Sequence, residues 1–361
     1  MKYKPLIILL ICFSSQLFSQ EEPSIKSVST CVVFLNDTKI EKLKTNEKAH
    51  GLNEENKNNE IPKIYRTYGT AFFVTDSVYS FYLVTAEHLA KDMTLNSDIV
   101  INGENDKPII FKLKDITLRK DSLIWTYNKS ADVATLLLDN YSTLLKNSKA
   151  SFIPLCYIEA KCIPPLRERE VTTIGFPLGI GYNNYFSPIS KISKPSSGLI
   201  EYPRFDNQKI STFFFLDDPS ISGFSGSPVF ELPTEYIIGN NKIFVSDCSL
   251  IGLVHGSLGD KTGGGFAAIV PASYIVETIK ISPKYSGILK CEYKNGKLWS
   301  ERMINNGKPW TVLNNFDKNG NSMEKGSLKN GNGSLFIYNE EGKLEFIENY
   351  LNGILINTEK K

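Results

Sequence analysis

The sequence predicts an all-β chain of the barrel or sandwich class, and three observations lead to this prediction. The chain is rich in aromatic residues, with 21 Phe and 17 Tyr among 361 residues, and aromatic side chains favour strands. Short apolar runs with many β-branched residues recur along it, separated by Gly, Pro, Asn, Asp and Ser. One segment, Pro271–Lys280, has the pattern of a longer helix, with a proline at its start.

The predicted strands are distributed over most of the chain. They are Ser27–Leu35, Tyr68–Val74, Ser80–Thr85, Ile99–Ile101, Ile109–Leu113, Val133–Leu138, Val171–Ile174, Lys191–Ile200, Ser211–Leu216, Pro228–Glu231, Lys242–Val245 and Ser249–Val254. The run Ala86–Lys91 suits a single helical turn. The stretch Asn36–Asn59 is loaded with Lys, Glu and Asn, so we expect a solvated loop or insertion there.

The N-terminal residues have the pattern of a secretory signal peptide. Lys2 and Lys4 precede an apolar run, and small and polar residues follow it, which predicts cleavage after Ser19 and a secreted or periplasmic protein. No later segment is long and apolar enough for a membrane span. Without the two leader lysines, 41 − 2 = 39 basic residues balance 39 acidic ones. This neutral charge argues against nucleic acid or an anionic membrane surface as the partner.

Five cysteines follow the leader, an odd number whose spacings match no metal-binding pattern; they are Cys31, Cys156, Cys162, Cys248 and Cys291. We therefore expect no metal and no cofactor. Cys156 and Cys162 are close enough in sequence for a local disulfide, while buried free thiols are an equal alternative.

The sequence pattern changes after Lys284. Turn dipeptides recur at intervals of 11, 13, 11, 11 and 11 residues, namely Asn295-Gly296, Asn306-Gly307, Asn319-Gly320, Asn330-Gly331, Glu341-Gly342 and Asn352-Gly353. Because Asn-Gly favours the type I′ hairpin turn, residues 285–357 are predicted to form a separate meander of short hairpins. The wording of Tyr293–Leu298 and Tyr338–Leu344 resembles MORN-variant repeats, and this resemblance implies a module that binds a substrate, an envelope component or a protein partner.

The segment Gly223–Phe230 is the strongest candidate for chemistry. Two glycines bracket Ser225, so the backbone can turn tightly and present both a hydroxyl and N–H groups on one surface. A nucleophilic serine needs this arrangement, since the N–H groups must receive the developing oxyanion. A plain turn between two strands explains the same residues equally well, unless a base and a carboxylate are found elsewhere.

Only three histidines could supply the base: His50, His88 and His255. His50 lies in the polar stretch and is expected to be solvated, whereas His88 and His255 each follow an apolar strand. Asp132 heads the apolar run Val133–Leu138, where a sheltered carboxylate needs a hydrogen-bonding partner. Each of these residues alone is more simply explained as structural.

Together these stretches resemble the trypsin/chymotrypsin-like serine peptidases. Thr85-Ala86-Glu87-His88, Asp132-Val133-Ala134 and Gly223-Phe224-Ser225-Gly226-Ser227-Pro228 match the family's three signatures in its His, Asp, Ser order. The resemblance covers residues 24–284 and implies two six-stranded β-barrels, at about 24–150 and 151–284. It further implies a His88/Asp132/Ser225 triad in the cleft between them and an oxyanion hole made by the N–H groups of Gly223 and Ser225.

Departures from the family pattern limit what the resemblance implies about substrates. Phe224 replaces the acid that pairs with a newly cut N-terminus in digestive members, and Pro219 replaces the pocket-base acid of trypsin-like specificity. The amino-acid sequence of the serine loop is closer to that of the glutamyl endopeptidase and HtrA-like branches. Substrate contacts are expected at Pro219, Val254, His255 and Gly256, with the His255 side chain turned away from the pocket because side chains alternate along a strand. The P1 preference stays open, with a lean towards small or apolar residues.

Two functions are consistent with these features. The first is an exported serine endopeptidase that acts on a protein or peptide substrate through an acyl-enzyme intermediate. The alternative is a catalytically latent peptidase fold that acts as a binding or adaptor protein through its C-terminal repeats.

Overall fold

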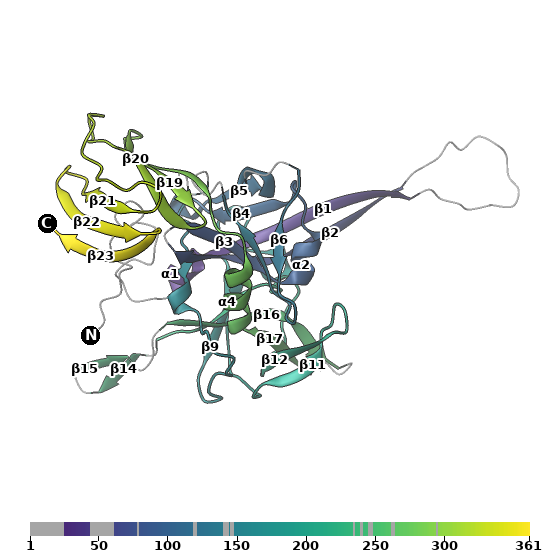
Figure 1. The fold of residues 1–361 in the computed structure, drawn as a ribbon. Helices are drawn as coiled ribbons and strands as arrows, with labels where there is room; N and C mark the ends of the chain where they lie inside the picture. The colour runs from purple at the N-terminus through teal and green to yellow at the C-terminus, as the bar shows by residue number, and fades with distance from the viewer. Residues whose placement is uncertain are drawn as a thin grey trace, which may run out of the picture.

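The computed structural model describes residues 25–43, 61–77, 79–117, 121–139, 144, 148–233, 235–238, 241–244, 248–260, 264–293 and 295–361. The expected signal peptide, residues 1–19, and His50 lie outside these residues. Within them, two large antiparallel sheets are followed by two small three-stranded sheets (Figure 1). The predicted all-β class is confirmed.

The first large sheet, here called the first barrel, has the strand order β5-β4-β1-β2-β3-β7-β6, with β8 paired in parallel to β2. The strands are β1 (Val32–Leu43), β2 (Ile61–Ser77), β3 (Ser80–Thr85), β4 (Asp98–Asn102), β5 (Pro108–Lys112), β6 (Trp125–Tyr127), β7 (Ala134–Leu137) and β8 (Ile153–Pro154). Since β8 belongs to this sheet, the first barrel extends slightly beyond the boundary expected at residue 150. The short helices are α1 (Ile25–Ser29), α2 (Glu87–Asp92), η3 (Glu104–Asp106), η4 (Leu113–Asp115) and η5 (Leu155–Tyr157).

The second large sheet, here called the second barrel, has the order β10-β9-β13-β16-β17-β12-β11. Its strands are β9 (Val171–Gly175), β10 (Ile189–Ser193), β11 (Ile200–Pro203), β12 (Ile210–Leu216), β13 (Pro228–Glu231), β16 (Ser249–Gly259) and β17 (Gly265–Pro271). A separate hairpin, β14 (Glu235–Ile238) and β15 (Asn241–Phe244), follows β13, and η6 (Pro177–Gly179) follows β9. Within the described ranges the two sheets have eight and seven strands, against six expected in each barrel.

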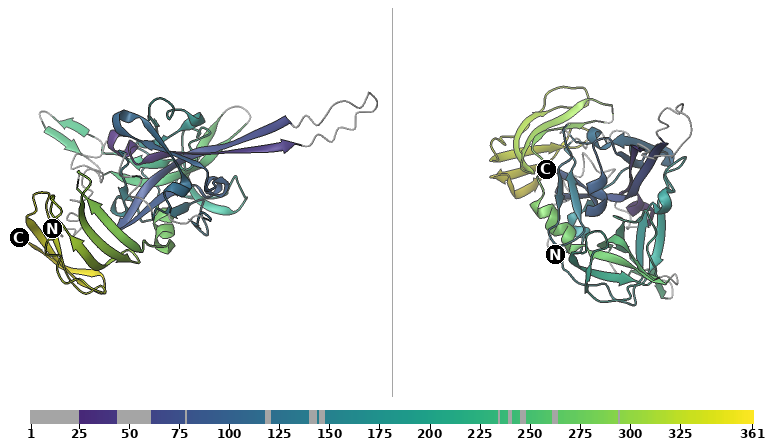
Figure 2. Two further views of the ribbon diagram at one scale, coloured as in Figure 1. Left: turned by 90° about the horizontal axis from the view of Figure 1, so that it is seen from above. Right: turned by 90° about the vertical axis from the view of Figure 1, so that its right-hand side faces the viewer.

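The β1–β2 hairpin corrects one expectation. The polar stretch was predicted to be a loop from Asn36 onward, but β1 continues to Leu43 and pairs with β2 back to Ile61. The hairpin therefore projects far beyond the body of the molecule (Figures 1 and 2). The polar composition misled the prediction because backbone pairing with β2 does not require buried side chains on both faces.

The predicted helix is α4 (Ser273–Ile281), which packs against the first barrel after the chain has completed the second. Asn128 directly follows Tyr127, the last residue of β6, in the loop to β7. It donates from Nδ2 to the Tyr274 carbonyl at 3.2 Å and to Thr278 Oγ1 at 3.1 Å. The Thr135 and Ser282 hydroxyls are 2.6 Å apart. These buried contacts fix the segment on either side of Asp132 against α4.

The C-terminal region consists of two three-stranded meanders. The first contains β18 (Gly287–Glu292), β19 (Leu298–Asn305) and β20 (Lys308–Asn315); the second contains β21 (Gly333–Tyr338), β22 (Leu344–Leu351) and β23 (Ile354–Lys360). They form one end of the molecule, drawn in green to yellow in Figure 1. The predicted hairpin character is therefore observed, although the identity of the repeats as MORN-like stays a prediction.

The turn dipeptides belong to two alternating kinds. At Asn306-Gly307, Asn330-Gly331 and Asn352-Gly353 both residues have positive φ, as a type I′ turn requires. At Gly296, Gly320 and Gly342 only the glycine has positive φ. The structural unit is therefore a pair of turns repeating every 22 to 24 residues, twice the interval that the sequence suggests.

The first meander is attached to the first barrel rather than tethered by a free linker. Lys284 forms an ion pair with Asp76, and the Tyr285 N–H donates to Ser80 Oγ at 3.2 Å. The buried Tyr79 side chain lies beside Arg302 and Glu348, which come from β19 and β22. One continuous apolar core accordingly joins the first barrel to both meanders.

Trp299 tests this continuous core. Its side chain is 5% exposed and stacks on Tyr293 with ring centroids 4.8 Å apart. Trp299→Ala should lower the free energy of unfolding by about 3–5 kcal/mol, because it leaves a large cavity. Denaturant unfolding measures this, with Tyr185→Ala as control, since Tyr185 is 70% exposed and its loss should cost about 0.5 kcal/mol or less. Equal effects of the two substitutions would contradict the assigned packing.

Candidate active site

The structure brings His88 and Asp132 into direct contact. His88 lies on α2, immediately after β3, and its Nδ1 is 2.7 Å from Asp132 Oδ2. The backbone N–H of His88 also donates to Asp132 Oδ1 at 3.0 Å. The ring is therefore held at two points by one carboxylate. When Nδ1 keeps its proton and donates it in a hydrogen bond to Asp132, Nε2 has a free lone pair and can accept a proton.

Asp132 is completely buried, with no exposed side-chain surface. Burial by itself would raise the pKa of this carboxyl, but the hydrogen bonds from His255 and His88 outweigh it and hold the pKa well below its usual value. Its loop is fixed locally because Asn128 Oδ1 accepts the N–H groups of Ser130 and Ala131, and Ser211 Oγ donates to the Ser130 carbonyl. Asp132 is thus an ionised, preorganised acceptor.

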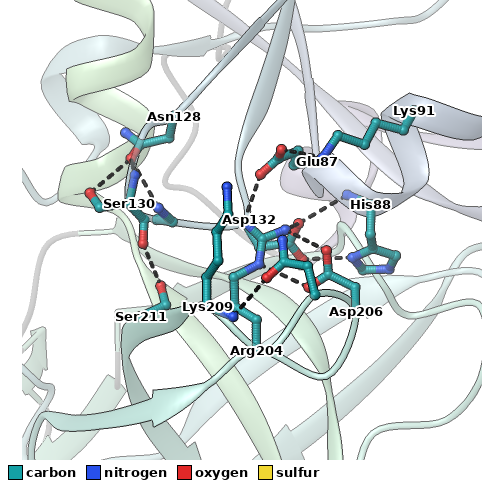
Figure 3. A network of polar contacts seen from close by, with 12 residues as sticks. Glu87, His88, Lys91, Asn128, Ser130, Asp132, Arg204, Asp206, Lys209 and Ser211 are labelled. Atoms are coloured by element: carbon teal, nitrogen blue, oxygen red, sulfur yellow. Dashed lines mark hydrogen bonds and ion pairs between the residues drawn. The ribbon is translucent and has the colours of Figure 1, made fainter.

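Arg204 is a member of the site that the sequence motifs do not reveal. It comes from the β11–β12 turn of the second barrel and is almost entirely buried. Its Nη2 is 2.8 Å from Asp132 Oδ1, its Nη1 is 2.6 Å from Glu87 Oε2, and it also pairs with Asp206 (Figure 3). Lys91 bonds the other Glu87 oxygen at 2.6 Å. An arginine of one barrel therefore bridges two carboxylates of the other.

The His255 side chain points across to the first barrel. Strand alternation does place Val254 in the second-barrel core, but the opposite face of β16 points to Asp132, and His255 Nδ1 is 2.5 Å from Asp132 Oδ2. Its Nε2 accepts the Phe205 N–H at 3.0 Å. Both ring nitrogens are thus hydrogen-bonded within the protein. The side chain is therefore not available for the substrate contact expected at His255.

The candidate ligand atoms of His88, Asp132 and His255 lie within 4.8 Å of one another. Among the described residues, this is the one cluster of His, Cys, Asp or Glu side chains close enough to hold a metal ion. A metal does not fit it. His255 Nε2 accepts an N–H, so the ring proton is on Nδ1, the atom that would have to coordinate. The Arg204 guanidinium on Asp132 further disfavours a second cation there.

The environment of His88 acts on its basicity in opposing directions. Burial lowers the pKa of the imidazole, but the hydrogen bond and charge of Asp132 more than offset this, so the pKa is raised above its usual value. Asp206 acts in the same direction as Asp132, and Arg204 acts against them. Such a balance suits a general base that works near neutral pH.

The Ser225 loop is fastened to β2 of the first barrel. The Thr70 N–H donates to the Ser225 carbonyl at 2.9 Å, and Thr70 Oγ1 donates to the Gly223 carbonyl at 2.8 Å. Gly223 and Gly226 have φ of +99° and +82°. A Cβ on Gly226 would lie 2.1 Å from the Thr70 carbonyl oxygen, so only glycine allows this approach.

Phe224 anchors the same loop from the other side. Its side chain is 2% exposed and belongs to the core cluster of the second barrel, with Phe214 and Val254 among its members. Phe224 is thus a hydrophobic anchor. The resemblance noted from sequence would place an ion-pairing acid here in a digestive peptidase. The loop is therefore held by packing and does not depend on a charged N-terminus.

The Ser225 hydroxyl and the backbone N–H groups of Gly223 and Ser225 have few hydrogen-bond partners among the described residues. Ser225 Oγ donates to the His255 carbonyl at 3.3 Å, a long bond, and it makes no bond to His88 within the described part of the chain. In that same part, the N–H groups of Gly223 and Ser225 have no acceptor. These groups are therefore free to receive a substrate oxygen. Catalytic hydrogen bonds are often long without substrate, so this geometry is compatible with proton transfer to His88.

The other residues expected to contact substrate are Pro219, Val254 and Gly256, and each has a defined environment in the structure. Pro219 is exposed, and its carbonyl accepts Lys191 Nζ at 2.6 Å. Val254 is buried in the core and accepts the Gly226 N–H through its carbonyl. Gly256 lies against the Phe205 ring, because a Cβ on this glycine would be 3.2 Å from Phe205 Cδ2. A cavity of about 410 Å³ lies instead between α2 and residues 121–127, and none of the three triad residues lines it.

All five described cysteines are free thiols, with Cys31, Cys248 and Cys291 buried and Cys156 and Cys162 exposed. The local disulfide considered from sequence is not formed. Among the described residues, no helix is long and apolar enough to cross a membrane.

Comparison with known proteins gives structural likenesses only. No family model and no curated protein matches the chain. An inactive form of Rv3671c from M. tuberculosis H37Rv is 14% identical, with a TM-score of 0.40 over 72% of this chain and 90% of that one. The HtrA-type protease AlgW, solved with a decapeptide, is 16% identical, with a TM-score of 0.42 over 75% of this chain and 70% of that one. Deg5 is 16% identical, with a TM-score of 0.36 over 71% and 90%.

Replacing Arg204 should be costly, because Asp132 and Glu87 would remain buried without their countercharge. Arg204→Met is expected to lower the free energy of unfolding by about 3–5 kcal/mol. Lys112→Met is the matched control, since it removes the exposed Lys112–Asp98 ion pair, which is worth about 1 kcal/mol or less. Chemical denaturation at pH 7 compares the two. A small effect of Arg204→Met would show that the guanidinium does not bridge the barrels.

Phe224 makes a second test of the site. Phe224→Asp, which restores the acid of the digestive pattern, should prevent stable folding or cost about 3 kcal/mol or more, because the carboxylate has no cationic partner in the core cluster. Phe224→Leu keeps most of the apolar volume and should cost only about 1–1.5 kcal/mol. Thermal unfolding of both variants checks this. A well-tolerated Asp would mean that the loop is not anchored as described.

Proposed function

We propose that this protein is a serine endopeptidase that hydrolyses peptide bonds with Ser225 as nucleophile, His88 as general base and Asp132 as its orienting carboxylate. The observation that carries the proposal is the buried Asp132–His88 pair, which leaves His88 Nε2 as an acceptor, beside a serine loop with unengaged N–H groups. Ser225 Oγ bonds the main chain of His255, whose ring packs against His88 at 5.6 Å between centroids. Nucleophile and base therefore lie in one neighbourhood.

The chemistry follows from these roles. Ser225 Oγ attacks the scissile carbonyl carbon while His88 Nε2 takes its proton, and the carbonyl oxygen becomes an oxyanion that the Gly223 and Ser225 N–H groups receive. His88 then gives the proton to the leaving amine as the C–N bond breaks. Water, deprotonated by His88, then attacks the acyl carbon. The ester bond to Ser225 Oγ breaks, and His88 returns the proton to Oγ. Asp132 stays ionised throughout and stabilises the imidazolium.

The finer assignments belong to the same proposal. A preference for small or apolar P1 residues rests on Pro219, which supplies no acid for Lys or Arg. Export rests on the leader pattern of residues 1–19. A partner for the C-terminal meanders, protein or envelope component, rests on their separate sheets and exposed strand β23. The closeness to the HtrA-like branch rests on the wording of the serine loop.

One observation favours the latent alternative. The Ser225 hydroxyl donates to the His255 carbonyl rather than to His88. If this bond persisted with substrate bound, the fold would serve as a scaffold, and binding through the meanders would be the function. Ser225→Ala would then leave the biological effect intact, while a chain ending near Lys284 would lose it.

Labelling with a fluorophosphonate probe tests the proposal. The full chain without its leader should be labelled once, at Ser225, and Ser225→Ala should abolish labelling. Ser222→Ala is the matched control, since Ser222 is exposed on the same loop and should label as the wild type does. Absence of labelling in folded wild-type protein would refute the proposed nucleophile. Cleavage-site profiling with the same wild-type preparation, not treated with the probe, then defines the P1 preference.

The pH dependence of kcat/KM gives an independent prediction. Only neutral His88 accepts the Ser225 proton, and Asp132 raises the pKa of His88. The acidic limb of the profile should therefore have its midpoint above about 6.5, the ordinary histidine value. Asp132→Asn should move the limb to lower pH and reduce kcat by about 10⁴-fold. An acidic limb well below 6.5 in the wild type would contradict the assigned base.

A further inference from the structure

One oxygen of Asp132 accepts hydrogen bonds from two imidazole rings. Asp132 Oδ2 is 2.7 Å from His88 Nδ1 and 2.5 Å from His255 Nδ1. His255 reaches it from β16 of the second barrel, at a β-bulge where the pairing with β17 shifts between Val254 and Gly256. A bulge of this kind re-aims a side chain, and here it directs the ring at the carboxylate of the other barrel.

The position of the His255 ring is fixed on every side. It is stacked against Phe205 at 4.8 Å and against Phe213 at 5.2 Å between ring centroids, and its residue is 3% exposed. The Phe205 N–H donates to Nε2 at 3.0 Å, so Nε2 carries the lone pair and the ring is neutral with its proton on Nδ1. His255 is therefore built as a single-proton donor to Asp132.

We propose that His255 is a positioning residue of the triad, which holds Asp132 Oδ2 in place and draws part of that oxygen's charge away from His88. The kinetic consequence rests on the proposed peptidase function, whereas the hydrogen-bond arrangement does not. Four donors surround the carboxylate: Nδ1 and the backbone N–H of His88, Nη2 of Arg204, and Nδ1 of His255. The carboxylate's acceptor sites are thus filled, which fixes its orientation.

The same arrangement moderates the base. Each additional donor to the carboxylate reduces the charge that stabilises the His88 imidazolium. The charged and titratable groups that face this pair are Glu87 from α2, Arg204 and Asp206 from the β11–β12 turn, and His255 from β16. Removing the His255 donor while the others remain should therefore make His88 more basic, and Asp132 less constrained.

Histidine-selective NMR of the full chain tests the arrangement without any substrate. The chain has three histidines, so a His50→Gln variant and variants at the other two positions assign every signal. At pH 8 the ¹⁵N shifts of wild-type His255 should identify the neutral ring with its proton on Nδ1. A ring with its proton on Nε2, or a charged ring, would overturn the proposal even if no variant folded.

Two substitutions separate hydrogen bonding from packing. His255→Phe keeps a ring between Phe205 and Phe213 but has no donor, whereas His255→Asn loses the ring and keeps an N–H near the place of Nδ1. The His88 titration midpoint should rise by about 1 pH unit in His255→Phe and stay within about 0.3 of wild type in His255→Asn. Unchanged midpoints in a folded His255→Phe protein would overturn the proposal.

Kinetics add a readout that a merely structural residue would not move. In His255→Phe, kcat/KM should fall about 10-fold, the size of one hydrogen bond, with most of the loss in kcat and the acidic limb moved to higher pH. His255→Asn should return the limb to its wild-type position. Equal losses in both variants with no movement of the limb would contradict the proposal. If the wild type cleaved nothing, the peptidase function would fail, and the NMR results would still decide the role of His255.

Discussion

The buried carboxylate of Asp132 is the constraint on which the rest of the structure depends. It belongs to the first barrel, yet two of its partners, Arg204 and His255, come from the second. A fully buried charge is tolerated only with such partners, because its desolvation would otherwise cost several kcal/mol. The two carboxylate oxygens of Asp132 therefore both join the two barrels and orient His88. Stability of the interface and alignment of the proposed base are two consequences of one set of hydrogen bonds.

The serine loop obeys a second constraint, the closeness of its backbone to β2. Thr70 bonds the carbonyls on both sides of the turn, and the glycines at 223 and 226 leave no room for a Cβ. Phe224 seats the loop in the core of the second barrel. The loop is consequently rigid before any substrate arrives, which is the condition for N–H groups to stabilise an oxyanion without reorganisation. The meanders share the apolar core of the first barrel.

Much of this could be predicted from sequence, and the exceptions have physical reasons. Most of the strands, α4 and the contact of His88 with Asp132 follow from local patterns and a three-part motif, whereas the single strand expected at 191–200 is divided between β10 and β11. Arg204 could not be found, since nothing near it in sequence shows that a turn 72 residues away from Asp132 reaches the carboxylate. His255 was available as one of three histidines, but strand alternation fixes only the face and not what lies beyond it. The β1–β2 extension was missed because backbone pairing leaves no hydrophobic signature in a polar ribbon.

The most direct test of the account is the crystal structure of the protein after reaction with a peptidyl diphenyl phosphonate. The account predicts one covalent bond, from Ser225 Oγ to phosphorus, with a phosphonyl oxygen about 3 Å from the N–H groups of Gly223 and Ser225. His88 should remain bonded to Asp132, and the Ser225 bond to the His255 carbonyl should be broken. An adduct on another residue, or a Ser225 that stays on the His255 carbonyl and unreacted, would contradict it.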